Sequence, residues 1–130
     1  MIEKSNWIDD LHKEFNSLFV KDKDNNIIRG IETGEGWKLH IAQFLQNISS
    51  VKSKRLKIYQ IKEKFGQIRI YVDCPRKCEY EVGIYIGRLE SLCYVTCENC
   101  GTIQHEINRR IDGWMINLCD KCYNEERNKK

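Results

Sequence analysis

The sequence predicts an α+β fold: two N-terminal helices, a small antiparallel sheet, and a third helix that leads into a C-terminal cysteine-rich ribbon. Three observations support this prediction. Apolar residues recur at helical intervals in three segments, two Ile- and Tyr-rich segments alternate as strands do, and two C-x-x-C pairs enclose a hairpin signal. The 130 residues, 41% of them apolar, are enough for one ordinary domain or two very small ones.

The first two helices follow from apolar residues spaced three and four apart. A helix over about residues 6–19 would place one apolar stripe against a core, and so would a second helix over about 37–49. The stripe residues are Trp7, Ile8, Leu11, Phe15, Leu18 and Phe19 in the first segment, and Trp37, Ile41, Phe44, Leu45 and Ile48 in the second.

The segment 79–94 carries two conflicting signals. Its Ile, Val and Tyr content favours a strand, and Gly83 and Gly87 weaken a helix. Apolar residues nevertheless recur at helical intervals over the twelve residues from Val82 to Cys93, which is longer than a typical strand. We therefore predict a third helix over this range.

The sheet is expected from two segments with partial alternation, about 56–62 and 67–73. A short loop, Lys64-Phe65-Gly66, lies between them, so two antiparallel strands are the simplest interpretation. Residues 27–31 are a further candidate for a short strand, and Gly34 and Gly36 then interrupt the pattern before the second helix.

Composition and charge limit the class of protein. The 22 Lys and Arg against 19 Asp and Glu give a formal net charge of +3, which is too mild to indicate nucleic-acid binding by itself. No stretch approaches the ~18 to 20 apolar residues of a membrane span, and the N-terminus shows no signal-peptide pattern. We therefore expect a soluble cytoplasmic protein with no membrane partner. Its seven cysteines then favour metal binding or catalysis over disulfides.

Four of these cysteines have the spacing of a metal site. Cys97-Glu98-Asn99-Cys100 and Cys119-Asp120-Lys121-Cys122 are separated by eighteen residues, and each C-x-x-C pair can turn two thiolates toward one ion. Four thiolates in a tetrahedron suit Zn²⁺ and leave no open coordination position, so we expect one structural zinc ion. The predicted ligands are Cys97, Cys100, Cys119 and Cys122.

The residues around these pairs predict a zinc ribbon. Gly101 lets the chain turn back after the first pair, and Asp112-Gly113 is a strong two-residue hairpin signal flanked by residues 107–111 and 114–118. We expect the ribbon over 96–123, after an α+β core over 1–95 and before a polar, flexible tail over 124–130.

The other three cysteines leave alternatives open. Cys74 and Cys78 lie at the end of a predicted strand in a C-x-x-x-C arrangement that could be a metal half-site, a redox pair or two thiols in a turn. Neighbouring Arg76 and Lys77 could lower a thiol pKa, which keeps a redox role open. Cys93 is most simply a small core residue.

Nothing in the sequence argues for catalysis. His12, His40 and His105 are scattered and show no metal or triad spacing, and each is interpreted as a surface or core histidine. There is no phosphate-binding glycine loop, no serine nucleophile elbow and no clear carboxylate pair. We expect a protein that is not an enzyme.

The segment 52–69 contains seven basic residues and a single acidic one, Glu63. Its aromatic side chains could stack on bases if they face outward, or they could pack inward behind a solvated sheet face. The candidate partner-binding residues here are Lys57, Lys62, Lys64, Phe65, Arg69 and Tyr71.

Several separated motifs together resemble one family of small, largely uncharacterised bacterial and prophage zinc-ribbon proteins. The matching pieces are Gly34-Glu35-Gly36-Trp37, then Lys62-Glu63-Lys64-Phe65-Gly66 with Ile68-Arg69-Ile70-Tyr71, and finally Cys97 to Gly101, Gly113-Trp114 and Leu118 to Cys122. Ile68 stands where the family usually has Leu, Cys122 where it often has His, and Thr33 where relatives often have Cys. The Cys74 and Cys78 pair is not a feature of the family.

The resemblance implies a phage or mobile-element setting and carries no established activity. From that setting we expect a binding protein that engages a host protein, including as an inhibitor of host or defence machinery. The alternative is a nucleic-acid-binding module that uses the basic segment 52–69. A third hypothesis is a redox-responsive regulator that uses Cys74 and Cys78. The sequence does not predict an oligomeric state.

Overall fold

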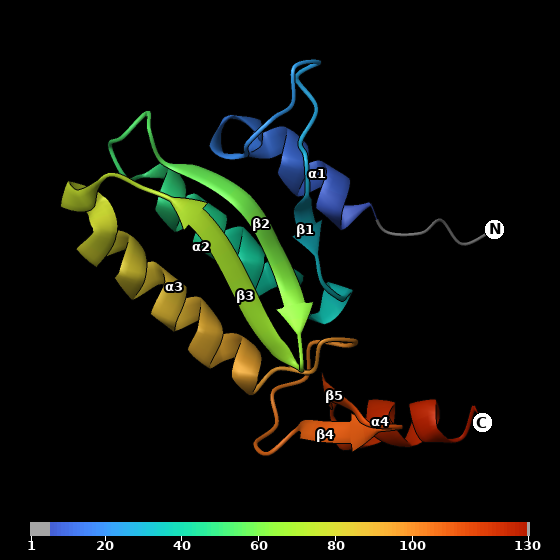
Figure 1. The fold of residues 1–130 in the computed structure, drawn as a ribbon. Coiled ribbons are helices and arrows are strands. Elements are labelled where there is room, and N and C mark those ends of the chain that lie inside the picture. Colours follow the sequence, from blue (N-terminus) through green and yellow to red (C-terminus); the bar gives the residue numbers. More distant parts are fainter. Residues whose placement is uncertain (1–5, 130) are drawn as a thin grey trace.

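The computed structural model describes residues 6–129 and shows an α+β fold (Figure 1). Four α-helices lie in this part of the chain: α1 (Trp7–Glu14), α2 (Lys38–Ser49), α3 (Glu79–Tyr94) and α4 (Asp120–Arg127). The strands are β1 (Gly30–Glu32), β2 (Lys57–Lys64), β3 (Gln67–Asp73), β4 (Asn108–Ile111) and β5 (Trp114–Asn117). No helix within residues 6–129 is long and apolar enough to cross a membrane.

The first three strands form one mixed sheet in the order β1–β2–β3. β2 and β3 pair antiparallel as predicted, whereas β1 pairs parallel with β2 and places Ile31 beside Ile61. The expectation of an antiparallel sheet is therefore wrong for this edge. A parallel pair needs a crossover connection, and α2 supplies it between β1 and β2.

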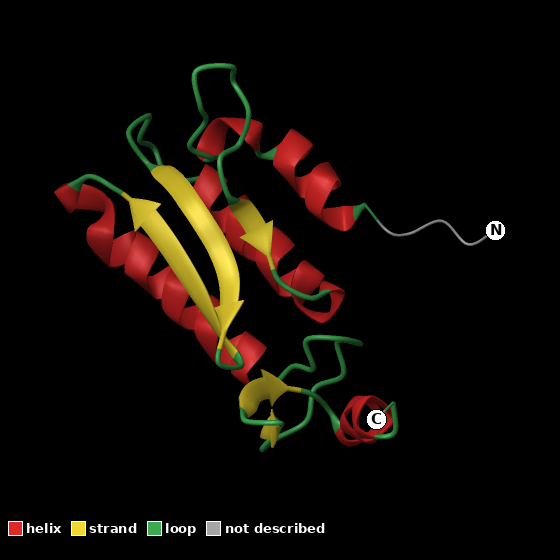
Figure 2. Ribbon diagram, turned by 45° about the vertical axis from the view of Figure 1, so that its right-hand side comes forward, coloured by secondary structure: helices red, strands yellow, loops and turns green. Residues whose placement is uncertain are grey.

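Helices α2 and α3 cover one face of this sheet, and α1 lies beside β1 (Figures 1 and 2). The core between helices and sheet is apolar and close to fully buried, so it supplies most of the hydrophobic stabilisation. Its largest buried side chains include Trp37, Ile41, Leu45, Ile48, Ile58 and Ile61. The opposite face of the sheet carries no helix in the described residues.

The N-terminal helix is shorter than expected. It ends at Glu14 rather than near residue 19, and a separate 3-10 turn follows over Asn16–Leu18. Buried Phe15 marks the break, and Phe19 forms an isolated parallel bridge with Ile58 of β2. A continuous helix would carry Phe19 away from that strand, so tertiary packing overrides the helical periodicity here.

The C-terminal segment is also different from the prediction. The sequence predicts a flexible tail over 124–130, but helix α4 extends to Arg127 and raises the helix count from three to four. Tyr123 anchors the helix, because its ring lies under the guanidinium groups of Arg109 at 4.9 Å and Arg127 at 5.5 Å. Residue 130 lies outside the described residues.

Two of the three histidines serve the fold. His12 Nε2 accepts a hydrogen bond from the Ile31 N–H at 3.0 Å, and its ring meets Phe19 edge to face. His40 Nε2 hydrogen-bonds with Thr96 Oγ1 at 3.0 Å. Burial lowers the pKa of both imidazoles, so the neutral rings are favoured in these contacts.

Candidate metal centre

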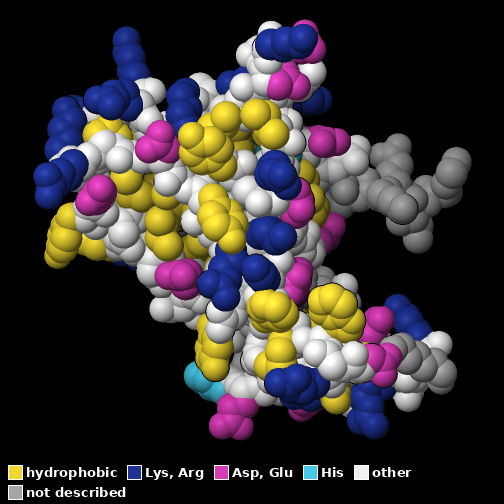
Figure 3. Space-filling model, in the orientation of Figure 1, with side chains coloured by type: hydrophobic (Ala, Val, Ile, Leu, Met, Phe, Trp, Pro, Cys, Tyr) yellow, Lys and Arg dark blue, Asp and Glu magenta, His cyan; other side chains and the backbone are white. Residues whose placement is uncertain are grey.

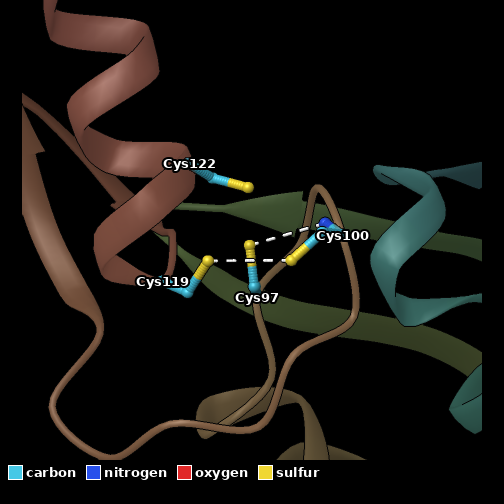
Figure 4. Close-up of side chains that lie close together, drawn as sticks. All are labelled: Cys97, Cys100, Cys119 and Cys122. Carbon is cyan, nitrogen blue, oxygen red and sulfur yellow. Dashed lines mark hydrogen bonds between the residues drawn. The ribbon is translucent and has the colours of Figure 1, made fainter.

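The four predicted ligands come together in one cluster. The Sγ atoms of Cys97, Cys100, Cys119 and Cys122 all lie within 4.8 Å of one another, so the cluster could hold a metal ion (Figure 4). Cys97 and Cys100 lie on the loop after α3, and Cys119 and Cys122 lie at the start of α4. The antiparallel hairpin of β4 and β5 lies between the two pairs in the sequence and brings the second pair back to the first.

The first C-x-x-C pair forms a tight turn. The Cys97 N–H donates to the Thr102 carbonyl at 2.8 Å, and the Gly101 N–H donates back to the Cys97 carbonyl at 2.9 Å. Gly101 has a positive φ of 85°, which a residue with a Cβ rarely adopts. This turn brings the Cys100 N–H within 3.5 Å of Cys97 Sγ, the arrangement that stabilises a thiolate.

The second pair belongs to a helix start. Cys119 is the N-cap of α4 and Cys122 lies in the first turn, where the helix dipole favours negative charge. The Asn99 amide donates to Cys122 Sγ at 3.3 Å. The hairpin that delivers this pair turns through Asp112 and Gly113, both at positive φ, as the Asp-Gly signal predicts.

Burial makes this cluster unfavourable for free thiolates. Cys97, Cys119 and Cys122 are buried, whereas Cys100 lies at the surface. Burial raises the pKa of Cys119, and it raises that of Cys122 to about 12, while the hydrogen bond between Cys100 and Thr102 lowers the pKa of Cys100 to about 6. A bound cation would supply the positive charge that deprotonated sulfurs need at such a site.

The glycine-rich segment before α2 docks onto the first pair. The Gly34 N–H donates to the Glu98 carboxylate at 2.8 Å, and the Gly36 N–H donates to the Glu98 carbonyl at 2.7 Å. A Cβ at Gly34 would lie 2.5 Å from the Glu98 carbonyl oxygen, and a Cβ at Gly36 would overlap the Cys97 carbonyl. The glycines therefore let two backbone segments, about sixty residues apart, touch each other.

Trp37 completes this contact from the core side. Its side chain is fully buried, and its indole N–H donates to the Thr96 carbonyl at 2.8 Å. Burial raises the pKa of the nearby Glu98 carboxyl to about 7, against the opposing effect of the Gly34 hydrogen bond. In the sequence, the Gly-Glu-Gly-Trp motif marks a helix boundary and a family resemblance, and it does not predict this contact with the cysteine cluster.

A second contact braces the hairpin. Asn117 is fully buried, and its amide donates to the carbonyls of Cys93 at 2.9 Å and Tyr94 at 3.0 Å. It also accepts a hydrogen bond from the Asn108 amide at 2.9 Å. Gly66, in the turn between β2 and β3, packs so closely that a Cβ there would overlap the Asn108 amide. The ribbon is thus fixed to the α+β core on two sides.

The remaining cysteines do not join the cluster. Cys93 and Cys78 belong to the apolar core, and half-buried Cys74 packs against it. Burial raises the pKa of Cys74, and the carboxylates of Glu79 and Asp73 add to this effect. The proposed lowering of a thiol pKa by Arg76 and Lys77 is therefore wrong for Cys74. Within residues 6–129, no group of metal-ligating side chains includes Cys74 or Cys78.

The candidate partner-binding residues mostly share one surface. Strand register places Lys62 opposite Arg69, on the side of the sheet away from Ile61 and Ile70, which pack into the core. We call this surface, together with the turn that follows β2, the open face; its candidate residues are Tyr59, Lys62, Lys64, Phe65, Arg69 and Tyr71. Figure 3 views the molecule from this side. Lys57 is instead engaged within the fold, since its ammonium donates to the Ser17 carbonyl at 2.6 Å.

Comparison with known proteins adds no relative. No protein-family model, no curated protein and no solved structure matches this chain.

Proposed function

We propose that this chain is a binding module that is not an enzyme and whose C-terminal ribbon folds around one structural zinc ion. The observation that carries the proposal is the convergence of four cysteine sulfurs. Four thiolates bound to Zn²⁺ at ~2.3 Å would stand about 3.8 Å apart in a regular tetrahedron. Cys100 and Cys119 Sγ are 3.6 Å apart and all four sulfurs lie within 4.8 Å of one another, so the ion would fit after shifts of about 1 Å or less in these separations.

The donor set favours a structural role. A fourth thiolate fills the position that a catalytic zinc keeps for water or substrate. The surroundings also hold the ligands, because the Cys100 N–H and the Asn99 amide point at two of the sulfurs. Zinc would then stabilise a hairpin and a short helix that are too small to fold alone.

The expected partner is a macromolecule in the cytoplasm of a host cell. The hypothesis of a host protein partner, and of inhibition of host or defence machinery, depends on the family resemblance. The alternative is a nucleic acid bound through the basic segment 52–69, and it is favoured by one observation, the position of Lys62, Lys64 and Arg69 of that segment on the open face.

Elemental analysis tests the zinc proposal. Purified protein should contain about one zinc per chain, and Cys97→Ser and Cys119→Ser should lose it, because three thiolates cannot complete the tetrahedron. Cys74→Ser is the matched control, since this thiol lies outside the cluster, and it should keep its zinc. Full zinc in either cluster variant would refute the assignment.

A capture experiment with and without nuclease separates the two partner classes. A host protein partner predicts one dominant protein that stays bound after nuclease treatment. The nucleic-acid alternative predicts that the captured material disappears with the nuclease.

A further inference from the structure

We propose that the open face of the β1–β2–β3 sheet binds single-stranded nucleic acid. This inference rests on the zinc-bearing fold proposed above and names the class of partner. Three features of the open face support it: cations outside the ion pairs of the described residues, of which Lys64 lies over the Phe65 ring at 5.7 Å, exposed aromatic rings, and a small pocket lined by two of those rings.

The cations form a band in the middle of the face. Lys62 and Arg69 are direct cross-strand neighbours, and Lys64 is the last residue of β2 on the same side. Figure 3 shows Lys and Arg side chains gathered over the sheet, with hydrophobic side chains above and below them. Two like charges directly opposite each other are unfavourable without a counter-anion, so the pair Lys62–Arg69 indicates an anionic partner.

Within residues 6–129 these cations form no ion pair. The ion pairs there join Lys38 to Glu35, Arg109 to Asp120 and Lys129 to Glu126, all away from the open face. Glu32 lies beside Lys62 in the register of β1 and β2 without forming an ion pair with it. The positive charge of this band is therefore available to phosphates.

Aromatic rings lie at both ends of the band. Tyr59 is 48% exposed, Tyr71 is 46% exposed and Phe65 is 54% exposed, high fractions for rings in or next to strands. At ~3.3 Å per residue of strand, Tyr59 lies about 17 Å along β2 from Lys64, the last residue of the strand, and Phe65 follows in the turn, with Lys62 and Lys64 between the two rings along the chain. Rings that flank a basic track suit stacking of successive bases above a backbone that follows the charges.

A pocket of about 220 Å³ lies at the tyrosine end of the face. Tyr59 and Tyr71 line it together with Gln60, Arg29 and Ile28. Gln60 and Arg29 bring an amide and a guanidinium to the same lining as the two rings, and such groups can hydrogen-bond the edge of a base that stacks on a phenol ring. Bases in a duplex are already stacked and paired, so this arrangement selects a single strand.

Fluorescence anisotropy with labelled 12-nucleotide probes tests the proposal. The probes are oligo(dT), oligo(U) and a DNA duplex of the same length, titrated with the zinc-loaded full chain at 50 mM and 200 mM salt. We expect one or both single strands to bind at least tenfold more tightly than the duplex, because only unpaired bases can stack. Affinity should also fall with salt, since phosphate binding releases counterions.

Three double variants separate charge from stacking. Lys62→Ala with Arg69→Ala should weaken binding and reduce the salt slope by about 1.4, or about 0.7 for each lost phosphate contact. Tyr59→Leu with Tyr71→Leu should weaken single-strand binding at least tenfold at unchanged salt slope, because stacking is lost while the charges remain. The matched control, Lys13→Ala with Arg88→Ala, removes two exposed charges from α1 and α3 and should bind like the wild type.

The same samples are checked for zinc content and thermal unfolding. Zinc-loaded, folded protein that binds no probe at 50 mM salt would overturn the nucleic-acid inference and leave the zinc module standing. Equal affinity for duplex and single strands, or full binding by the tyrosine variant, would also overturn it. A chain without zinc would instead contradict the proposed function itself.

Discussion

The buried amide of Asn117 provides the sharpest test of how the ribbon is attached to the core. In Asn117→Ala, the carbonyls of Cys93 and Tyr94 lose the donor that reaches them at 2.9 and 3.0 Å. A buried polar group left without a partner costs ~1–3 kcal/mol. The hydrogen bond to the Cys93 carbonyl is buried and contributes fully, whereas the one to the Tyr94 carbonyl is partly exposed and contributes less. Together they predict that Asn117→Ala lowers the free energy of unfolding by about 2–4 kcal/mol.

Urea unfolding of the zinc-loaded protein, followed by circular dichroism, measures this loss. A change of 3 kcal/mol should also lower the Tm by roughly 10 °C for a chain of this length. Asn117→Asp keeps the side-chain size but places a carboxylate oxygen against two carbonyl oxygens, so it should be at least as destabilised as Asn117→Ala. Asn124→Ala, at an exposed position of α4, is the control and should stay within about 0.5 kcal/mol of the wild type.

Two results would refute the reasoning. If Asn117→Ala unfolds with the same free energy as Asn124→Ala, the amide does not hold the ribbon to α3. If Asn117→Asp is as stable as the wild type, the donor role is wrong and only the size of the side chain matters.

Three further predictions follow from the same contacts. Gly36→Ala should lower the free energy of unfolding by at least about 2 kcal/mol, because the new Cβ would overlap the Cys97 carbonyl. Gly87→Ala, in an open part of α3, should raise the free energy of unfolding by about 0.5–1 kcal/mol. Urea unfolding in which the two variants change stability in the same direction, or each in the direction opposite to the one expected, would contradict this. Burial lowers the pKa of His12 below 6.5 in the folded state, so the unfolded chain takes up the proton at a higher pH than the folded chain does. The free energy of unfolding should therefore fall as the pH drops below about 6.5. His12→Gln can still accept the hydrogen bond from the Ile31 N–H, and its free energy of unfolding should decline less steeply with pH at constant zinc content. Removing the metal with a strong chelator should speed hydrogen exchange at the Gly34 and Gly36 amides, because both donate to Glu98 beside Cys97. The amides of α2 should stay protected. Unchanged exchange at both glycines would show that the contact between the 34–36 segment and the first C-x-x-C pair does not depend on the metal.

Local patterns predicted those parts of the fold that depend on local interactions. The twelve-residue periodicity in 79–94 outweighed its strand-like composition, and α3 spans Glu79–Tyr94. Asp112-Gly113 predicted the hairpin turn because a two-residue turn needs positive φ at both positions. The spacing of the cysteines predicted which sulfurs meet, since each C-x-x-C pair forms its own turn.

The features that the sequence did not predict depend on contacts between segments that are distant along the chain. The parallel pairing of β1 has a partner about thirty residues away, and three residues of strand carry too weak a pattern to indicate it. The polar segment after Cys122 shows no apolar stripe, yet α4 forms, with Cys119 as its N-cap and with the Tyr123 ring in contact with the guanidinium groups of Arg109 and Arg127. Glycine at positions 34 and 36 suggests that a side chain is not tolerated there. The sequence alone does not indicate that the backbone of Cys97 and Glu98 is the neighbour that excludes it.

The contact of Trp37 and the two glycines with Thr96 and Glu98 also has a consequence for the order of folding during synthesis. A ribosome makes the N-terminal half first, and a domain folds as a unit once its segments are available. When α2 emerges, the Trp37 indole and the Gly34 and Gly36 amides still lack their acceptors, which lie 59 to 64 residues further along the chain. These three hydrogen bonds can therefore form only after the first C-x-x-C turn has been made, so the contact between the N-terminal core and the cysteine-rich segment forms late in the synthesis of the chain.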